Sequence, residues 1–507
     1  MSPPFSFFLS FFPYSVTKIN ISYTFIHTFI NPFIHPFNIH PTMAPSHLSL
    51  TLIFIILCIP ISSSEKLSLT PLTITHITTQ QTQTQLIKNN NKNSHDDPML
   101  QTLNYLTTSS LARAHRLKNP HDNTSSSEVP MFPQSYGGYS IKLSFGSPGQ
   151  ELTFVMDTGS SLVWFPCTHR YTCSDCDFPN IDEMNITKFI PKMSSSAKLL
   201  GCSNKKCGWI FGSSSPVKCN GKDICPAYML QYGSGSTSGL LLSETLNFPE
   251  GGVKDFVVGC SILSTRQPSG IAGFGRGSSS LPAQMGLKKF SYCLVSHRFD
   301  DKPVSSELAL VRDDSSAKSA GVSYTKFRKN PVNSRSAFLE YYYVNLRKIT
   351  VGGKTVKIPY GYLVPGNDGN GGTIIDSGTT FTFMDGHVYD LVAKEFETQM
   401  SKYKRALDVE TQSGLRPCFN IGDKPVEFPE LSFHFKGGAK LVLPLADYFS
   451  ILGESGVLCM TIVSSSTVGK NSGMGPSIII GNYQQQNIYL EYDLENGRLG
   501  FKKQICK

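Results

Sequence analysis

The segment FVMDTGSSLVWFPC, residues 154–167, places an acid directly behind a run of apolar residues. Phe, Val and Met precede Asp157, and the small turn Thr-Gly-Ser-Ser that follows it leads back into apolar residues. A carboxylate at the end of a buried strand is costly when no other group pairs with it. The segment therefore predicts that a partner for Asp157 arrives from another part of the chain.

An internal repeat supplies that partner. Residues 373–384, TIIDSGTTFTFM, repeat the order of apolar residues, Asp, a hydroxyl residue, Gly, two hydroxyl residues and apolar residues. Each acid motif is followed by a segment of two apolar residues and a Gly, which ends at Gly273 in the first half and at Gly481 in the second. Glycine permits close backbone approach, so these segments are expected to run beside the acid-bearing loops. The repeat predicts two related halves that contribute one carboxylate each, Asp157 and Asp376.

Length and composition indicate a two-domain, mainly β protein. A chain of 507 residues is too long for a single hydrophobic core. Alternating stretches such as YSIKLSF, residues 139–145, and many Gly-rich turns are typical of β-strands. Apolar residues from Val388 to Tyr403 recur every three or four positions and predict one clear helix, with Asp385 as its N-cap. The net charge of +9 is spread without a run of like charges, which argues against nucleic acid as a partner.

The N-terminal region is predicted to carry a targeting signal. Met43 opens a segment whose apolar core and following small residues are typical of a signal peptide, residues 43–64. Residues 1–42 are then an upstream extension. A signal anchor is the alternative, but no membrane segment is expected once the signal is removed. The predicted destination is the secretory pathway, ending in the extracellular space (apoplast or cell wall) or the vacuole.

Residues 65–130 have the polar, biased composition of a pro-segment and linker. Within them, LNYLTTSSLARAHRLKNP, residues 103–120, carries several basic residues and is expected to form a short helix. Two interpretations stay open. The basic segment pairs with acids in a cleft and blocks it, or it is a disordered spacer.

The acid motifs and their glycine partners resemble those of pepsin-like aspartic proteases, in particular the nepenthesin-like plant branch. The resemblance extends from about Tyr136 to the C-terminus. It includes MLQYGSGSTSG, residues 229–239, which is similar to the hairpin flap that closes over substrate in this family. Tyr232 and Gly233 match the flap positions, and Trp164 is expected either near the flap or in the core.

The resemblance implies a bilobal acid protease fold with a central cleft and a flap hairpin. The N-terminal lobe is expected over residues 136–325, with a Cys-rich insert at 166–226, and the C-terminal lobe over residues 338–507. Among the Asn-x-Ser/Thr sequons, Asn185 lies within the expected mature chain and is the predicted glycosylation site.

Asp157 and Asp376 are the catalytic residues that the resemblance implies. Two carboxylates within hydrogen-bonding range cannot both ionise cheaply and therefore share a proton, a behaviour for which this family's dyad is the usual example. The ionised member accepts a proton from water, and the protonated member polarises the peptide carbonyl. No cofactor or metal is required. The residues expected to support the dyad are Thr158, Gly159, Ser160, Ser377, Gly378 and Thr379.

The chain is thus predicted to be a secreted, monomeric aspartic endopeptidase that acts on polypeptides at acidic pH and is made as a zymogen with its own pro-segment as a partner. The alternative is a non-catalytic relative that inhibits or binds secreted glycosidases. A serine nucleophile is less well supported, because Thr237 occupies the nucleophile position of GSTSG, residues 235–239.

The thirteen Cys indicate an oxidising compartment. Cys173-x-x-Cys176 admits a zinc site, but the number and irregular spacing of the Cys favour disulfides. The pairs that the resemblance implies, carried over by order, are Cys167–Cys173, Cys176–Cys260, Cys202–Cys225, Cys207–Cys219, Cys293–Cys506 and Cys418–Cys459.

Overall fold

The four-strand pattern around each acid is the basis of the fold. In the first half, β3 (Gln150–Asp157) runs parallel to β10 (Gly270–Gly273), β10 runs antiparallel to β4 (Trp164–Pro166), and β4 runs parallel to β9 (Val253–Thr265). In the second half, the same order and directions recur with β17 (Thr373–Ile375), β26 (Ile478–Ile480), β18 (Thr382–Met384) and β25 (Ile462–Ser464). The internal repeat in the sequence is therefore a structural duplication.

The two predicted glycines lie where backbones meet. A Cβ atom on Gly273 would stand 2.3 Å from the carbonyl carbon and oxygen of Ser161, and one on Gly481 would stand 2.3 Å from the Thr380 carbonyl oxygen. Real Cβ atoms do not approach backbone this closely, so only glycine fits at either position. The expectation that these segments run beside the acid-bearing loops is confirmed.

The structure, a computed structural model, describes part of the chain, and all of that part belongs to one compact unit, Lys66–Lys507. The described residues are 69–76, 98–118, 138–176, 186–211, 223–232, 235–249, 251–267, 269–296, 305–312, 318–331, 336–422, 427–452, 456–464 and 475–506. The predicted upstream extension 1–42 and signal peptide 43–64, and the predicted roles of Asn185, Cys219 and Gly233, fall outside these residues.

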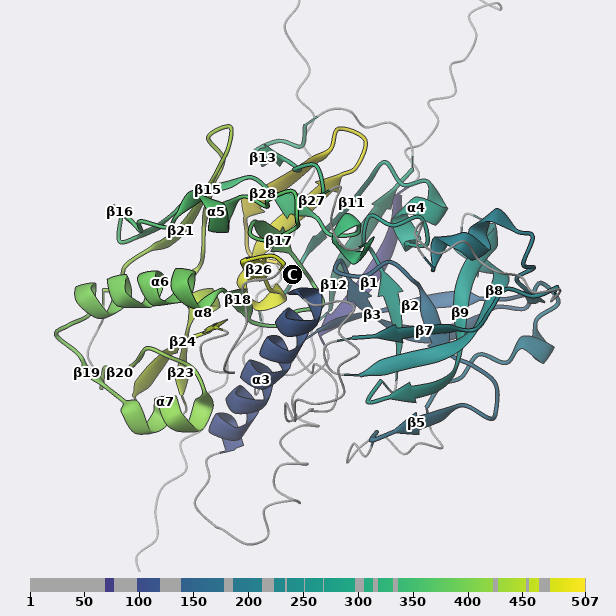
Figure 1. Cartoon of the computed structure of the whole chain (residues 1–507), viewed down its shortest axis with the longest axis horizontal. Helices are drawn as coiled ribbons and strands as arrows, with labels where there is room; N and C mark the ends of the chain where they lie inside the picture. Colours follow the sequence, from purple (N-terminus) through teal and green to yellow (C-terminus); the bar gives the residue numbers. More distant parts are fainter. Residues whose placement is uncertain are drawn as a thin grey trace, which may run out of the picture. The chain divides into compact units, whose positions relative to one another are not determined.

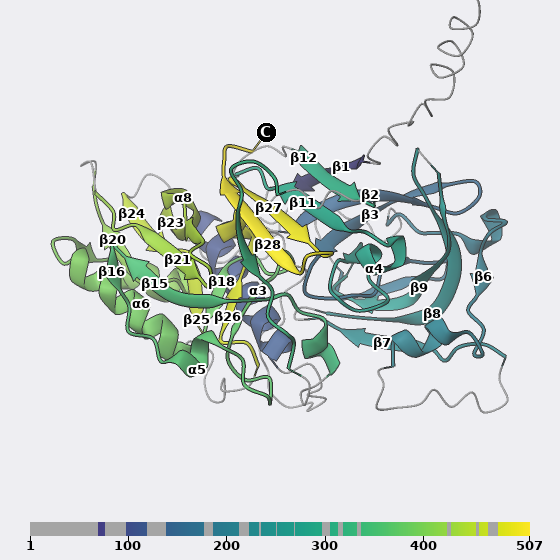
Figure 2. The ribbon, with the colours of Figure 1, turned by 90° about the horizontal axis from the view of Figure 1, so that it is seen from above.

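The largest sheet joins strands from both halves of the chain (Figures 1 and 2). Its 15 described strands are, in order, β13 (Ser323–Lys326), β28 (Arg498–Lys503), β27 (Ile488–Asp493), β11 (Lys289–Cys293), β12 (Ser305–Val311), β1 (Leu69–His76), β2 (Tyr139–Phe145), β3, β10, β4, β9, β8 (Ser236–Asn247) and β6 (Lys198–Leu199), with β5 (Thr172–Ser174) beside β9 and β7 (Tyr228–Gln231) beside β8. Thus the last two strands of the predicted C-terminal lobe pair with β11 and β13 of the predicted N-terminal lobe.

The second half of the chain adds smaller sheets and four of the six described helices. The strands not yet given are β14 (Tyr343–Val344), which pairs with β17, then β16 (Lys354–Thr355), β15 (Leu346–Val351), β21 (Leu431–Phe435) and β22 (Lys440–Val442) in one sheet, and β19 (Lys404–Arg405), β20 (Cys418–Asn420), β24 (Val457–Met460) and β23 (Phe449–Leu452) in another. The helices of the described residues are α3 (Pro98–Lys118), α4 (Leu281–Met285), α5 (Tyr360–Leu363), α6 (Gly386–Gln399), α7 (Leu407–Ser413) and α8 (Leu445–Tyr448). Short 3₁₀ turns are η2 (Pro191–Met193), η3 (Lys205–Trp209), η4 (Ser336–Leu339) and η6 (Asn482–Gln485).

The core is continuous across the two halves. Phe290 of β11 and Tyr492 of β27 stack with ring centroids 4.3 Å apart and planes at 12°. Both side chains are fully buried in one large apolar cluster. Aromatic pairs of this kind add to the free energy gained from burial alone, so the pairing of β11 with β27 helps to fix one half against the other.

Two helices show how the predicted patterns were realised. The Asp385 carboxylate accepts a hydrogen bond from His387 N at 3.2 Å and caps α6, as predicted, while the helix ends at Gln399, before the predicted limit at Tyr403. The predicted short helix over residues 103–120 is longer at its N-terminus and becomes α3, with 21 residues. Among the described residues, no helix combines the length and apolar character needed to span a membrane.

The disulfides of the Cys-rich insert differ from the predicted ones. The described bridges are Cys167–Cys260, Cys173–Cys176, Cys207–Cys225, Cys293–Cys506 and Cys418–Cys459. The last two agree with the expected pairs. The predictions Cys167–Cys173, Cys176–Cys260, Cys202–Cys225 and Cys207–Cys219 are wrong.

The strand arrangement explains the first correction. Because β4 runs parallel to β9 with Phe165 opposite Cys260, Cys167, which directly follows β4, lies beside Cys260, with Cα atoms 5.0 Å apart. Cys173 and Cys176 then pair with each other across a tight turn, which contradicts the zinc alternative for these two residues.

Candidate active site

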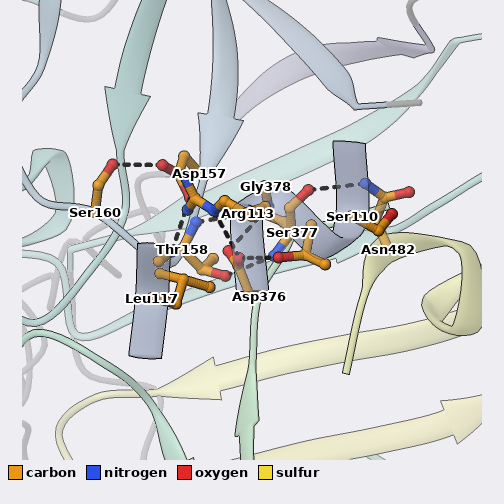
Figure 3. A network of polar contacts seen from close by, with 12 residues as sticks. Ser110, Arg113, Leu117, Asp157, Thr158, Ser160, Asp376, Ser377, Gly378 and Asn482 are labelled. Atoms are coloured by element: carbon orange, nitrogen blue, oxygen red, sulfur yellow. Dashed lines mark hydrogen bonds and ion pairs between the residues drawn. The ribbon is translucent and has the colours of Figure 1, made fainter. Parts of the chain in front are cut away.

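The two acid-bearing loops meet in one place, where Asp157 and Asp376 lie on either side of Arg113 (Figure 3). A Cβ atom on Gly159 would stand 2.6 Å from Asp376 Oδ1, and one on Gly378 would stand 2.4 Å from Asp157 Oδ1. Each glycine therefore lies directly against the carboxylate of the opposite half. The absence of a side chain at both positions is what lets the two acids enter one site.

Reciprocal hydrogen bonds lock the loops together. The Thr158 N–H donates to Ser377 Oγ at 3.1 Å, and the Ser377 N–H donates to Thr158 Oγ1 at 2.9 Å. Each hydroxyl also donates to a carbonyl just before the opposite acid, Thr158 to Ile375 O at 3.4 Å and Ser377 to Met156 O at 2.9 Å. All of these groups are buried. The network fixes the relative position of the carboxylates without using any carboxylate oxygen.

Each carboxylate accepts the same two hydrogen bonds from its own loop. The glycine two residues on donates its N–H to Oδ1, at 2.9 Å in the first half and 3.0 Å in the second, and the hydroxyl three residues on donates to Oδ2 at 2.5 Å in both. The four donors are the N–H groups of Gly159 and Gly378 and the hydroxyls of Ser160 and Thr379. These contacts favour the ionised form of a buried acid.

A residue that the sequence analysis did not single out joins the two acids. Arg113, on α3, donates from Nη2 to Asp157 Oδ1 at 2.6 Å and from Nε to Asp376 Oδ2 at 3.2 Å. Its side chain is buried together with both carboxylates. One guanidinium thus pairs with both carboxylates, which shows that they share a single site (Figure 3).

Burial and charge push the pKa values of the two acids apart. Burial opposes ionisation of Asp157, but the Arg113 guanidinium and the hydrogen bonds from Ser160 and Gly159 outweigh it and lower the pKa of this carboxyl. Burial raises the pKa of Asp376, and the negative charge of Asp157 adds to that effect against the opposing charge of Arg113. These opposite shifts favour the negative charge on Asp157 and the proton on Asp376 within the coupled pair.

Helix α3 is anchored around Arg113 by contacts to the second half of the chain. Ser110 Oγ accepts a hydrogen bond from Phe381 N at 2.9 Å, and the carbonyl of Leu117 accepts one from the Tyr341 hydroxyl at 3.1 Å. The helix also packs on α7, β18 and β25, and Figure 1 shows it running alongside the strands of the second half. The segment is therefore docked in the site by several contacts besides its ion pairs.

The last residue of α3 is a buried lysine. Lys118 Nζ donates to Pro476 O at 3.1 Å, lies 3.7 Å from Asp385 Oδ2 and stands 5.1 Å from the centroid of the Phe383 ring. Burial lowers the pKa of Lys118 to about 8, although the charge of Asp385 opposes this shift. Keeping this ammonium charged inside the protein costs free energy that its partners only partly offset.

The predicted flap is a hairpin of β7 and β8. Tyr232 is buried at its end, and its hydroxyl accepts a hydrogen bond from Trp164 Nε1 at 2.8 Å. Trp164 is fully buried, so both expectations for it, near the flap and in the core, hold. Burial and the nearby charge of Asp157 raise the pKa of Tyr232, which keeps its hydroxyl neutral.

A cleft of about 460 Å³ opens beside the Asp157 loop and under the flap. The residues that line it are Arg113, Arg116 and Leu117 of α3, Gly159 to Leu162 of the acid loop, Trp209 and Ile210, Met229 to Tyr232 of the flap, and Ser279, Ala337, Glu340 and Tyr341. The arrangement provides two buried carboxylates of unequal pKa next to an open space, which suits general acid–base chemistry on a bound molecule.

Comparison with known proteins finds relatives that match most of the chain. The family described as "Xylanase inhibitor N-terminal" matches residues 139–307, and "Xylanase inhibitor C-terminal" matches residues 341–503. The chain is 32% identical to a probable aspartyl protease of Arabidopsis thaliana, over 73% of this chain and 82% of the relative. It is also 32% identical to aspartic proteinase nepenthesin-2 of Nepenthes gracilis, over 76% of this chain and 81% of the relative.

Solved structures support the fold. The crystal structure of basic 7S globulin from soybean superposes with a TM-score of 0.52 at 18% identity, covering 72% of this chain and 93% of that one. At this identity the likeness concerns the fold alone, which is the pepsin-like fold predicted from the sequence.

Proposed function

Because the chain belongs to the nepenthesin-like branch of the plant aspartyl proteases, we propose that it is an endopeptidase whose catalytic residues are Asp157 and Asp376. One observation carries the proposal: the duplicated loops bring both carboxylates to a single guanidinium, within 2.6 and 3.2 Å of its nitrogens. Two acids held this close in a buried site are suited to share one proton.

The chemistry follows from that shared proton. With α3 removed, a water molecule between the carboxylates gives a proton to the ionised acid and attacks the carbonyl carbon of the peptide bond. The protonated acid donates to the carbonyl oxygen at the same time, and a proton then passes to the departing nitrogen. The hydrogen bonds from the two glycine N–H groups and two hydroxyls hold the acids in place during these transfers.

Helix α3 acts in this proposal as an inhibitory pro-segment. Arg113 fills the space between the acids and pairs with both, so water and substrate are excluded while the helix is docked. Of the two interpretations of residues 103–120, this favours the one in which the basic segment pairs with acids and blocks the cleft.

Release of the helix is expected to be driven by acid. The pKa of Asp157 is lowered, because the charge of Arg113 is the largest of the contributions that outweigh the effect of burial. The stabilisation from this pair is present above the ordinary carboxyl pKa and is lost as pH falls through the lower pKa of the docked state. Lys118 does not add to this acid dependence, because its lowered pKa changes the free energy of docking only between about pH 8 and the ordinary lysine value of about 10.4.

The proposed setting is the secretory pathway, with extracellular space or vacuole as the place of action. Five described disulfides support an oxidising compartment. Polypeptides are the proposed substrates, and the mature enzyme is proposed to be a monomer that needs no cofactor.

The test is hydrolysis of an unfolded protein substrate after acid treatment of the full chain, at about pH 3–5, with and without a pepstatin-type transition-state mimic. We expect cleavage that the mimic blocks and that falls by about 10³-fold or more in Asp157→Asn and in Asp376→Asn. Circular dichroism of each variant checks that it is folded. A folded wild-type chain that cleaves nothing over this range would instead favour the non-catalytic binding protein.

A further inference from the structure

A third acid, Glu340, stands in the cleft beside the catalytic pair. It follows η4 directly, and its carboxyl carbon would lie 3.3 Å from a Cβ atom added to Gly277. The same Cβ would lie 2.5 Å from Ser161 Oγ, so Glu340 and the acid loop meet at this point. Glu340 therefore lines the wall of the cleft on the side of Asp157.

The backbone holds Glu340 in place. Its N–H donates to Ala337 O at 3.0 Å, and its carbonyl accepts a hydrogen bond from Arg276 N at 2.8 Å. The residue's own turn and the separate segment at Arg276 thus hold its backbone in place. A side chain on such a rigid support is suited to recognise a ligand.

Within the part of the chain that the structure describes, Glu340 has no ion-pair partner. Burial raises the pKa of its carboxyl, and the negative charge of Asp157 adds to this, while the Ser161 hydroxyl opposes it. A cation next to the carboxylate favours the ionised form and so opposes both effects that raise this pKa. The wall of the cleft therefore contains a carboxylate that a cation would stabilise.

The chain itself now supplies cations to this cleft. Arg113 and Arg116, one turn apart on α3, both line it, and Arg116 Nε donates to Gln231 O of the flap at 3.0 Å. Once α3 leaves, the described residues that line the cleft include Glu340 but no Lys, Arg or His. The site loses its positive charges at the step that opens it to substrate.

The rest of the cleft suits a long side chain with a charged end. Its walls include the apolar side chains of Trp209, Ile210, Met229 and Leu230. Lysine and arginine bury their aliphatic stems on such surfaces while the charged head reaches a polar partner. The volume of about 460 Å³, measured with α3 in place, leaves room for a substrate residue next to the acid loop.

We propose that Glu340 is a specificity residue, which binds the lysine or arginine side chain of a polypeptide substrate within the acidic, apolar-walled subsite between the flap and the Asp157 loop. This inference rests on the proposed function, because it assigns a substrate preference to that enzyme. Ser161, next to the carboxylate, positions Glu340, and the flap residues cover the stem of the bound side chain.

The test uses the processed enzyme and a series of fluorogenic peptides. Lys, Arg, Met or Glu is placed in turn at each of about six positions around the scissile bond, and kcat/KM is measured at about pH 5.5, where a cation-paired carboxylate is ionised. At one position we expect kcat/KM for the Lys and Arg peptides to exceed that for the Met peptide by about tenfold, which is the usual scale of a charge-assisted contact. In Glu340→Gln that Lys/Met ratio falls to about 1.

The ratio is taken within each variant, so a general loss of activity or folding cancels. Glu340→Lys should reverse the preference towards the Glu peptide at the same position. Glu151→Gln is the matched control, because Glu151 is an exposed acid on β3 that pairs with Lys142, and it should leave the wild-type ratio intact. A Lys/Met ratio near 1 at every position in an enzyme that cleaves the Met peptides, or a ratio that survives Glu340→Gln, overturns the subsite alone. Failure to cleave any peptide overturns the proposed protease, and the subsite with it.

Discussion

Replacing Arg113 by Gln should undock α3 from the acid pair. The change removes a guanidinium that lies 2.6 Å from Asp157 and 3.2 Å from Asp376 inside the protein. Breaking a buried ion pair by removing one partner costs about 3–5 kcal/mol. Burial and the charge of Asp157 raise the pKa of Asp376, and proton uptake by the pair reduces the negative charge that is left without a partner. We therefore take the lower end, about 3 kcal/mol, which makes local opening of the helix about 100-fold more frequent.

Amide hydrogen exchange of the intact chain at neutral pH measures that opening. The amides of α3 should lose about two orders of magnitude in protection in Arg113→Gln, while those of β3 and β17 keep theirs. A small fluorogenic peptide should also be cleaved by the unprocessed variant, because the carboxylates become accessible without proteolysis.

Arg116→Gln is the matched control. Arg116 lies on the same helix with the same charge, but it donates to the Gln231 carbonyl at an exposed position rather than to the acids. Arg116→Gln should lower the hydrogen-exchange protection of the α3 amides by less than about tenfold. Equal losses in the two variants, or unchanged protection of α3 in Arg113→Gln, would show that the ion pairs with the acids do not hold the helix.

Two further changes test the site and the fold. Gly159→Ala places a methyl group 2.6 Å from Asp376 Oδ1, so kcat of the processed enzyme should fall by about 100-fold; Gly208→Ala, where the added methyl meets no atom within 4 Å, should leave kcat unchanged. Burial raises the pKa of Asp447 to about 8, so the stability it contributes is complete below the ordinary carboxyl pKa of about 3.9 and is lost as the pH rises towards 8. When the pH is lowered from 7 to 4, the free energy of unfolding measured in urea should rise by about 4 kcal/mol more in the wild-type protein than in Asp447→Asn. Parallel pH profiles of the two proteins would refute this.

The two acid-bearing loops were predictable because the contacts that shape them are local. Asp157 is followed within three residues by the groups that hydrogen-bond to it, and the same is true of Asp376. Two copies of such a pattern leave little freedom in how the halves combine. The glycine segments were predictable for the same reason, since a backbone that must approach another closely admits only one residue type at Gly273 and Gly481.

The disulfides of the Cys-rich insert were not predictable in this way. A disulfide depends on which strands lie side by side, and the sequence separation of Cys167 and Cys260 is 93 residues. Order along the chain contains no information on the parallel pairing of β4 with β9 that brings these two together. The two bridges in agreement with prediction link β11 to the C-terminus and β20 to β24, outside the insert.

Arg113 was missed, although the sequence holds a signal for it. The buried residues of α3 include Leu103, Leu106, Ala114 and Leu117, which recur at helical spacing on one face, and Arg113 lies on that same face. A guanidinium in the middle of an apolar face cannot be buried alone, because the cost of desolvating it demands an acidic partner. The composition of residues 65–130 does not reveal this docked helix, because a disordered spacer can also be polar with scattered basic residues. Had the helix period been followed through Arg113, the two buried acids that the repeat requires, one from each half, would have been its natural partners.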